Sequence, residues 1–300
     1  MNKLTLLTHE NDLTSFNADF LMPIYEKHFN IEFFDSNKIY DRKNTIVING
    51  LFKNSSWSLH LHDYKTVIDN LAEIKKDTNI DNKLYLTCKN WFWYSESLWY
   101  IHLGFDNYVP NKTYEKLALM PMRLEHKHRK LLFDKVRPFL NDFIYSFVAR
   151  GITLPEDLLD NNDVFQRNFN PKWYDSTYFS LVSETLVESN TMFVTEKTFK
   201  PFAYSHPLLV FGIPGTLKFL QSLGFETYSN LFDESYDNKN NLIDRLNCIC
   251  DNIKNFVKTP YDKLTLQKIE HNKNLFYNKQ IVEQQIIKEI IEPIYVYAET

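Results

Sequence analysis

The residues best suited to bind a phosphate-bearing substrate lie together in the segment Thr195-Glu196-Lys197. Thr195 is a typical N-cap residue, so we expect a short helix that begins at Glu196. The start of such a helix attracts phosphate through free backbone N–H groups and the positive end of the helix dipole. Lys197 is unfavourable at that end by roughly a few tenths of a kcal/mol, which a bound diphosphate would offset. The Glu196 carboxylate is suited to accept hydrogen bonds from a ribose diol.

The residues on both sides of this segment also predict a ligand site. An apolar strand expected at 179–182 leads into Ser183 and Glu184, and ligands of parallel sheets bind beyond the carboxyl ends of the strands. We expect Pro201 to end the helix. Half of the six glycines fall within thirteen positions, namely Gly212, Gly215 and Gly224. Concentrated glycine indicates backbone that turns sharply or approaches a ligand closely, whereas an isolated Thr-Glu-Lys triplet is most often a solvated first turn.

One dense basic cluster lies upstream, formed by Arg123, His126, Lys127, His128, Arg129 and Lys130. A solvated helix face is one interpretation. The functional one is that Arg123 or Arg129 binds a diphosphate, because a planar guanidinium binds phosphate through two hydrogen bonds. Contact of this cluster with DNA is the weaker alternative, since the flanking sequence supplies no wider basic surface.

Two segments resemble the donor site of a known enzyme family. The first segment is a strand followed by Ser183-Glu184, a loop, Thr195-Glu196-Lys197, His206-Pro207 and Gly212. Over about 35 residues, this order resembles the donor-site signature of the α1,3-fucosyltransferase-like GT-B glycosyltransferases and of related viral glycosyltransferases. The strand expected at 117–120, the loop 121–126 and the helix start 127–129 resemble that family's first donor-domain strand and its arginine-bearing loop. The resemblance covers roughly the second half of the chain.

This resemblance implies an α/β fold of two Rossmann-like domains with a donor cleft between them, and an inverting transfer from a nucleoside-diphosphate sugar. It implies that Arg129 and Lys197 hold the phosphates and that Glu196 holds the ribose. The donor-binding residues are then Arg129, Glu184, Thr195, Glu196, Lys197, Gly212 and Gly215. Where the family usually has an aromatic residue followed by Glu and Asn, this sequence has Ser183-Glu184-Thr185. The loop before Glu196 is a little longer than in the cellular fucosyltransferases. The resemblance favours a GDP-sugar over a UDP-sugar as the donor, with a fucose-like hexose as the sugar that is transferred.

Other phosphate and metal motifs are missing from the sequence. No Asp-x-Asp occurs, so we expect a metal-independent reaction without a resident cofactor, and no glycine-rich phosphate loop is present. His60-x-His62-Asp63 has the spacing of a metal pair but lacks further ligands. An inverting transfer needs a general base from the first domain. Glu96, which lies among aromatic residues, is the first candidate and Asp63 the second, ahead of His60 and His62.

Alternating apolar segments predict the elements that position these residues. In the first third we expect strands at 4–8, 31–34, 45–49 and 84–87, with helices at 20–29 and 64–76. In the second half we expect strands at 116–120, 143–148, 179–182 and 208–211 and a helix at 127–139. The resulting domains are 1–110 on the acceptor side, 111–278 for the donor, and a helix at 279–300 that packs back across them and breaks at Pro293.

Composition narrows the setting of the protein. The 300 residues carry a formal net charge of -4, three cysteines without zinc or disulfide spacing, and no apolar stretch long enough to span a membrane, so we expect a cytoplasmic protein. The bias towards Asn, Lys and Ile indicates an AT-rich genome, such as a viral one.

Three readings of the function stay open. The acceptor is a glycan or a lipid-linked oligosaccharide in the first, favoured by the low charge. It is a hydroxymethylated pyrimidine of viral DNA in the second. The third is a non-catalytic nucleotide or glycan-binding module, against which the presence of Arg129, Glu196 and Lys197 argues.

Overall fold

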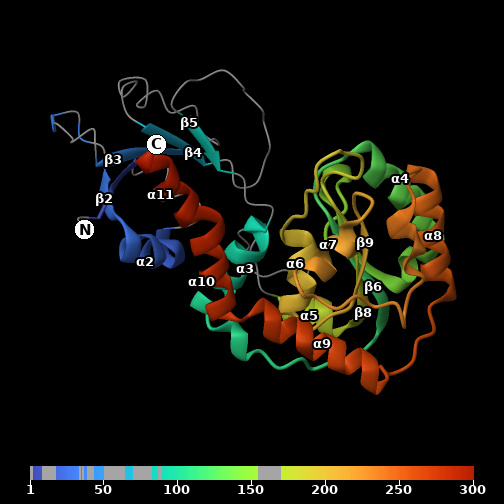
Figure 1. Ribbon diagram of the computed structural model, residues 1–300. Helices are drawn as coiled ribbons and strands as arrows, with labels where there is room; N and C mark the ends of the chain where they lie inside the picture. Colours follow the sequence, from blue (N-terminus) through green and yellow to red (C-terminus); the bar gives the residue numbers. More distant parts are fainter. Residues whose placement is uncertain are drawn as a thin grey trace. The chain divides into compact units, whose positions relative to one another are not determined.

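The computed structural model describes residues 3–8, 18–33, 35, 37–38, 44–50, 65–69, 83–86, 90–154 and 170–300. The chain divides into two compact units (Figure 1). One consists of Met1–Leu103 together with Lys279–Thr300, and the other of Gly104–Asn278. Each unit contains a parallel sheet accompanied by helices, which confirms the predicted α/β class.

The first unit is built on a five-stranded parallel sheet in the order β2-β1-β3-β4-β5. Its strands are β1 (Thr5–Thr8), β2 (Asn30–Phe33), β3 (Thr45–Gly50), β4 (Lys65–Asp69) and β5 (Lys83–Leu86). The helices α2 (Ala18–His28) and α3 (Trp91–His102) belong to the same unit. The four strands and the first helix expected for this region are therefore present, within a few residues of the predicted ends.

The prediction of a helix at 64–76 is wrong for the part of this segment that the structure describes. Residues Lys65–Asp69 form β4, which pairs in parallel with β3 on one side and β5 on the other. Val67 and Ile68 fitted a helical spacing, but with Thr66 they make three consecutive β-branched residues, which favour an extended backbone. A short apolar run fits both the helical period and the strand period. Pairing with strands on both sides is what makes this segment a strand.

The C-terminal segment stays helical through the proline that was expected to break it. The helix α10 (Lys279–Ile286) continues into the π-helical turn η7 (Ile287–Ile291) and then α11 (Glu292–Glu299). Pro293 lies in the first turn of α11, where a missing N–H is tolerated. Within the first unit, Asn90 and the Tyr94 hydroxyl donate to Glu289 at 2.9 Å each, so this segment is tied to α3.

The second unit is built on a four-stranded parallel sheet in the order β7-β6-β8-β9. Its strands are β6 (Lys116–Met122), β7 (Phe143–Phe147), β8 (Thr177–Ser183) and β9 (Leu208–Phe211). All residues of β8 and β9 are buried, as expected for strands covered on both faces. The four strands predicted for this half of the chain are all present.

Helices cover both faces of this sheet (Figure 1). α4 (Lys127–Val136) and α8 (Leu242–Asn255) pack together on one side, while α6 (Glu196–Ala203) packs against β8, β9 and α9 (Lys263–Phe276). The other helices among the described residues of the unit are α5 (Pro171–Asp175), α7 (Thr216–Ser222) and the 3-10 turns η2 (Phe105–Asn107), η3 (Arg137–Asp142), η4 (Val148–Arg150) and η6 (Glu234–Asn238).

The expectation that Pro201 ends α6 is wrong by two residues, because the helix continues to Ala203. The fixed φ of proline is compatible with a helix, but the residue loses one N–H from the ladder and crowds the carbonyl of Lys197, so only two residues of α6 follow it. The Pro201 carbonyl accepts from the N–H groups of Tyr204 at 3.2 Å and His206 at 2.9 Å, and these bonds close the helix end.

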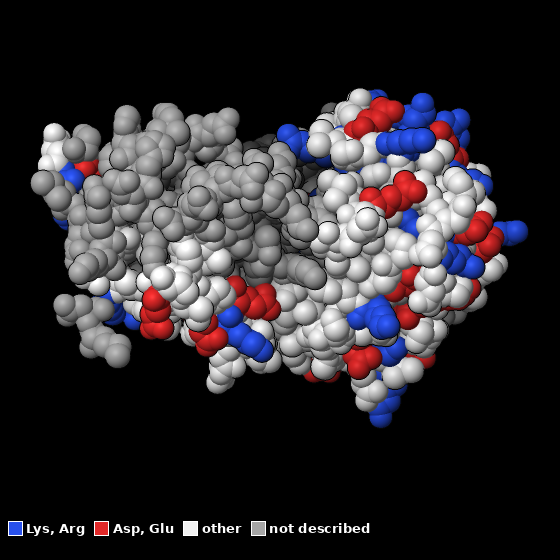
Figure 2. All heavy atoms as spheres, turned by 45° about the horizontal axis from the view of Figure 1, so that its top comes forward, with Lys and Arg blue, Asp and Glu red and all other residues white. Residues whose placement is uncertain are grey.

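Charged side chains of both signs are interspersed over the described part of the face seen in Figure 2. No wide basic surface is seen on that part of the face, in line with the formal net charge of -4. Among the described residues, no helix is both long and apolar enough to cross a membrane.

Candidate functional site

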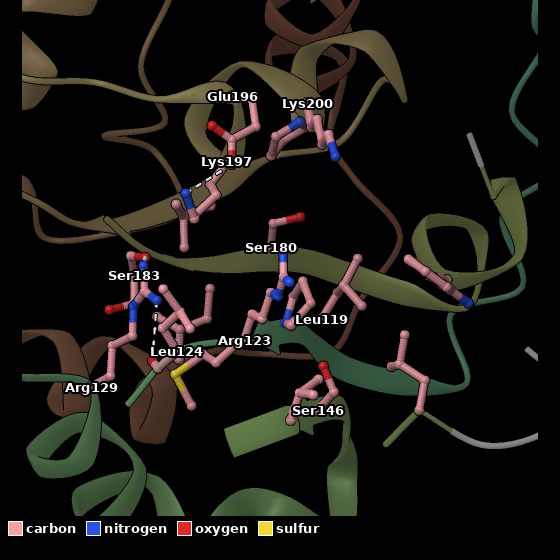
Figure 3. Close-up of a pocket in the computed structure, with 18 of the residues that line it drawn as sticks. Leu119, Arg123, Leu124, Arg129, Ser146, Ser180, Ser183, Glu196, Lys197 and Lys200 are labelled. Carbon is pink, nitrogen blue, oxygen red and sulfur yellow. Dashed lines mark hydrogen bonds and ion pairs between the residues drawn. The ribbon is translucent and has the colours of Figure 1, made fainter. Parts of the chain in front are cut away.

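A cavity of about 340 Å³ lies in the second unit, beside the carboxyl ends of β6 and β8 and the start of α6 (Figure 3). Its polar side is formed by Arg123, His126, Arg129, Ser183, Thr185, Glu196, Lys197 and Lys200. Its apolar wall includes Leu119, Leu154, Trp173, Tyr174 and Pro201. The strand ends of a parallel sheet are where ligands of such folds bind, so the cavity is the candidate functional site.

Glu196 and Lys197 start α6 and both line the cavity. The Lys197 Nζ lies 2.8 Å from Glu196 Oε1 and donates to the hydroxyl of Thr195 at 3.0 Å. Burial on its own would raise the pKa of Glu196, but the nearby ammonium groups of Lys197 and Lys200 together hold it below its usual value. Glu196 is therefore a carboxylate at neutral pH and serves as a hydrogen-bond acceptor.

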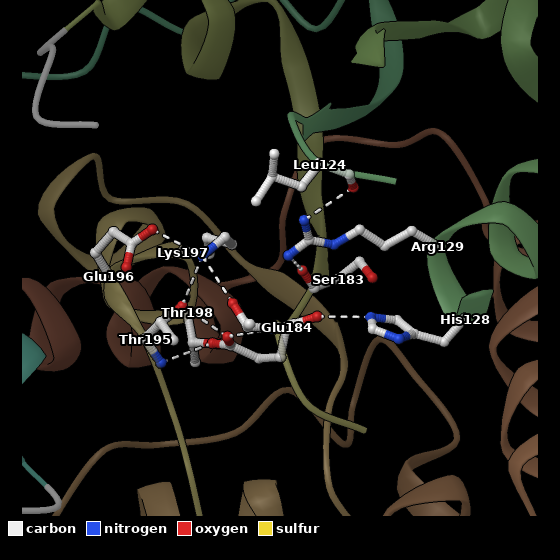
Figure 4. Close-up of polar contacts among 10 residues, drawn as sticks. Leu124, His128, Arg129, Ser183, Glu184, Thr195, Glu196, Lys197 and Thr198 are labelled. Atoms are coloured by element: carbon white, nitrogen blue, oxygen red, sulfur yellow. Dashed lines mark hydrogen bonds and ion pairs between the residues drawn. The ribbon is translucent and has the colours of Figure 1, made fainter. Parts of the chain in front are cut away.

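Glu184 does not line the cavity, although it directly follows Ser183, which does. Its side chain is fully buried and accepts from the Thr195 N–H at 2.9 Å, the Thr195 hydroxyl at 2.6 Å and the Thr198 hydroxyl at 2.5 Å (Figure 4). A carboxylate with this many donors is firmly held. Glu184 thus fastens the end of β8 to the first turn of α6 and fixes where Lys197 lies.

Thr195 occupies the N-cap position of α6, as expected, but its hydroxyl makes no capping bond to the helix. The hydroxyl donates to Glu184 and accepts from Lys197 instead. The Thr198 N–H is satisfied by the Thr195 carbonyl at 3.1 Å. Thr195 therefore links the buried carboxylate to the cation at the cavity.

Arg129 reaches the same cavity from α4 and is only 2% exposed. Its two terminal nitrogens donate to the carbonyls of Leu124 at 3.2 Å and Ser183 at 3.3 Å (Figure 4). Burial lowers the pKa of Arg129 while the carboxylates of Glu184 and Glu196 raise it. An arginine remains charged at neutral pH even so. A buried guanidinium is thus held at the end of β8, next to the cavity.

Three shielded polar atoms of cavity residues have no hydrogen-bond partner within the described part of the chain. They are Arg129 Nε, Ser183 Oγ and His126 Nε2. Leaving such an atom unsatisfied costs about 1 to 3 kcal/mol, and folded proteins rarely do so without a ligand or water at that place. The three atoms belong to residues that line one cavity, so hydrogen-bonding capacity that the described residues do not use is gathered beside it.

The charges of the cavity lining favour an anion. Four cationic side chains line it, namely Arg123, Arg129, Lys197 and Lys200, and Glu196 is the one carboxylate among the lining residues. A low-dielectric site with excess positive charge binds phosphate groups strongly. Lys200 was not among the sequence candidates. Its position one helical turn after Lys197 was the signal that could have identified it.

The two glycines expected at the donor site do not line the cavity. Gly215 is the N-cap of α7 and has a φ of 85°, which a side chain rarely adopts. A Cβ on Gly212 would lie 2.7 Å from the Thr216 hydroxyl oxygen. Both glycines are thus required by the turn between β9 and α7.

The candidates for general base belong to the first unit. Glu96 lies in the middle of α3, rather than directly after a strand, and is 2% exposed. Asp63, His60 and His62 lie outside the described residues. Among the described residues, no group of three or more His, Cys, Asp and Glu side chains is arranged to hold a metal ion.

Comparisons with known proteins give structural matches alone. No family model and no curated protein matches the sequence. The chain is similar to a crystal structure of α1,3-fucosyltransferase, with 13% identity, a TM-score of 0.49 and coverage of 94% of this chain and 92% of that chain.

Two further crystal structures of α1,3-fucosyltransferase are also similar. The one with GDP-fucose has 12% identity, a TM-score of 0.42 and coverage of 92% and 91% of the two chains. The one with GDP has 12% identity, a TM-score of 0.41 and coverage of 94% and 92%. The family that the sequence motifs resemble is thus also found among the structures similar to this chain.

Proposed function

We propose that the chain is a glycosyltransferase of the GT-B type, which binds the diphosphate of a nucleotide sugar in the cavity between Arg129 and Lys197. The observation that carries the proposal is the convergence of a buried guanidinium, an ammonium group and the start of α6 at the end of β8. Arginine and lysine at a helix start are the groups that bind a diphosphate without a metal ion.

In the proposed reaction the acceptor hydroxyl oxygen forms a bond to the anomeric carbon from the face opposite the diphosphate. The bond from that carbon to the phosphate oxygen breaks, and its electron pair stays on the departing nucleoside diphosphate. The hydroxyl proton passes to a general base, for which Glu96 and Asp63 are the candidates. Arg129 and Lys197 stabilise the negative charge that accumulates on the phosphate oxygens, and the sugar is transferred with inversion.

Glu196 has a separate role in this proposal, because it is the one carboxylate of the cavity lining. It stays ionised at neutral pH, so its oxygens accept hydrogen bonds from two neighbouring hydroxyl groups. A ribose diol presents such a pair of donors. We assign Glu196 to the ribose of the donor.

The proposed donor rests on the motif resemblance, and the proposed acceptor rests on the net charge of the protein. A GDP-sugar carrying a fucose-like hexose is the proposed donor, and no further cofactor takes part. A glycan hydroxyl is the proposed acceptor, because a formal net charge of -4 supplies no general attraction to the phosphate backbone of duplex DNA.

Thermal unfolding with GDP, UDP, ADP, CMP and their sugar conjugates tests the proposal. At a hundredfold excess over Kd, a ligand stabilises the native state by about 2.7 kcal/mol, which raises the Tm by several degrees. We expect one nucleoside diphosphate and its conjugates to raise the Tm. Lys197→Met should abolish the shift, and Lys254→Met, which changes an exposed lysine of α8, should retain it. If no nucleotide raises the Tm of the unmodified protein, the proposal is wrong.

A further inference from the structure

His126 has an unusual position beside the proposed phosphate site. It is the N-cap residue of α4, with an extended backbone, and its ring stacks on that of His128 with centroids 5.5 Å apart and planes 5° apart. His126 lines the cavity together with Arg129 and Ser183. Its Nε2 atom is shielded from solvent and has no hydrogen-bond partner within the described part of the chain.

The stacked partner fixes which of the two rings can become charged. The His128 Nε2 lies 2.9 Å from the Glu184 carbonyl, which only accepts, so this nitrogen carries a proton and donates it. Burial lowers the pKa of His128 to about 4, so the ring is neutral at pH 7. A proton taken up by the pair near neutral pH therefore goes to His126.

The surroundings of His126 keep it neutral in the free protein. The charged residues that line the same cavity as His126 are Arg123, Arg129, Glu196, Lys197 and Lys200, the ring of His128 stacks on it, and Glu125 and Lys127 are its neighbours along the chain. Burial lowers the pKa of His126, and the charges of Arg129 and Lys197 lower it further. A bound diphosphate would offset both cations and reverse this effect.

We propose that His126 is a proton-linked ligand of the donor diphosphate, neutral in the free protein and protonated when the diphosphate lies beside Arg129 and Lys197. This inference rests on the proposed function. In the bound state Nε2–H donates to a phosphate oxygen, and Arg129 Nε and Ser183 Oγ supply two more hydrogen bonds to the same group. Among the residues that line the cavity, these are the three shielded atoms without a partner in the described part of the chain.

The role in the reaction is to hold positive charge where the leaving group becomes negative. When the bond from the anomeric carbon to the phosphate oxygen breaks, the electron pair stays on that oxygen and the proton stays on His126. After the nucleoside diphosphate leaves, the proton returns to solvent. Stabilisation is greatest where the charge develops, as required for an effect on kcat.

The sign of the pH dependence follows from the direction of the change in pKa. Because binding raises the pKa of His126, the donor binds more tightly as the pH falls through the bound-state pKa, and the gain levels off below the free-state pKa. The affinity changes by at most about tenfold per pH unit for one proton. A nucleotide sugar is a suitable probe because its diphosphate is esterified at both ends and does not titrate in this range.

Isothermal titration calorimetry with GDP-fucose measures this linkage. Titrations at about pH 6 and about pH 8, in buffers of different ionisation enthalpy, give the affinity and the number of protons taken up. We expect the unmodified protein to take up a fraction of a proton and to bind several-fold more tightly at the lower pH. His126→Asn should remove both effects, because asparagine keeps a donor but does not titrate. His271→Asn, which changes an exposed histidine of α9, should retain them.

Equal proton uptake in the unmodified protein and in His126→Asn would overturn the inference while leaving the proposed function intact. A second measurement needs no variant. The histidine ring signals followed by NMR during a pH titration should show that inorganic pyrophosphate raises the pKa of His126 by about one unit or more. If pyrophosphate leaves that pKa unchanged, the inference fails. If it raises the pKa while no nucleotide sugar binds, His126 belongs to an anion site and the proposed function fails.

Discussion

In the second unit, the two strands whose residues are all buried, β8 and β9, each lead into a helix, and the two connections differ in what occupies the helix start. At α7, the side chain of Asp237 accepts from the N–H groups of Leu217 at 3.0 Å and Lys218 at 3.2 Å. At α6, the buried Glu184 carboxylate accepts from Thr195 and Thr198. Of these two connections, only the one to α6 contributes residues to the cavity.

This difference shows that a glycine-rich turn and a helix dipole are insufficient for a ligand site. The α7 start has the glycines and the dipole, but a carboxylate of the protein already satisfies its N–H groups. The α6 start has Lys197 in its first turn, and Arg129 approaches it from α4. Cations that the fold directs to one point distinguish the two connections.

The largest effect on activity is expected from Arg129→Met, which removes the buried guanidinium but keeps an unbranched side chain. Loss of a donor to a developing negative charge lowers kcat by about 10² to 10³-fold. Arg150→Met should change kcat little, because Arg150 does not line the cavity and forms a partly exposed ion pair with Glu125 at 3.0 Å. Steady-state transfer assays with each variant measure this. Equal losses in both variants would contradict the role of Arg129.

The two buried carboxylates allow a direct test of the comparison. Glu184→Gln and Asp237→Asn each replace an acceptor of several hydrogen bonds, so each should lower the free energy of unfolding by about 1 to 3 kcal/mol. Only Glu184→Gln should also weaken donor binding, because it releases the first turn of α6. Urea unfolding and calorimetry of both variants measure the two quantities. The comparison does not hold if Asp237→Asn weakens donor binding to the same extent.

Glu196→Gln should show its effect through pH and through KM. The pKa of Glu196 is held below its usual value, so its stabilising interactions are present above about pH 4.5 and are lost as the pH falls through the depressed pKa. The variant should therefore lose less stability on acidification than the unmodified protein. Its KM for the donor should rise by about tenfold, consistent with the loss of a hydrogen bond to a charged group. An unchanged KM for the donor would contradict the assignment of Glu196 to the ribose.

The smallest effect on function is expected from Gly215→Ala. The φ of 85° at this position is strained for alanine by about 1 to 2 kcal/mol, which thermal unfolding should reveal as a lower Tm. Donor affinity should not change, since Gly215 does not line the cavity. A marked loss of donor affinity in a folded variant would show that the α7 connection is part of the donor site.

The sequence predicted the elements wherever one local signal dominated. The strand β9 is a continuous apolar run and the centre of β8 is apolar apart from Ser180, and the predicted ends of both lie within two residues of the observed ones. The segment that forms β4 was misassigned because its apolar residues fit two periods, and only the neighbouring strands select one of them. The sequence predicts breaks at Pro201 and Pro293, but α6 ends two residues after Pro201, and Pro293 lies in the first turn of α11, where proline is tolerated.

By itself, the sequence determined the α/β class, the strands of the second unit and the segment that supplies Glu196 and Lys197, because these depend on residue types that are neighbours along the chain. The tertiary structure decided which charged groups meet. It buried Glu184 as a fastening for α6, assigned Gly212 and Gly215 to a turn, and brought His126, Arg129 and Lys200 to the cavity. Those outcomes depend on how α4, α6 and β8 pack, and no local pattern in the sequence specifies that packing.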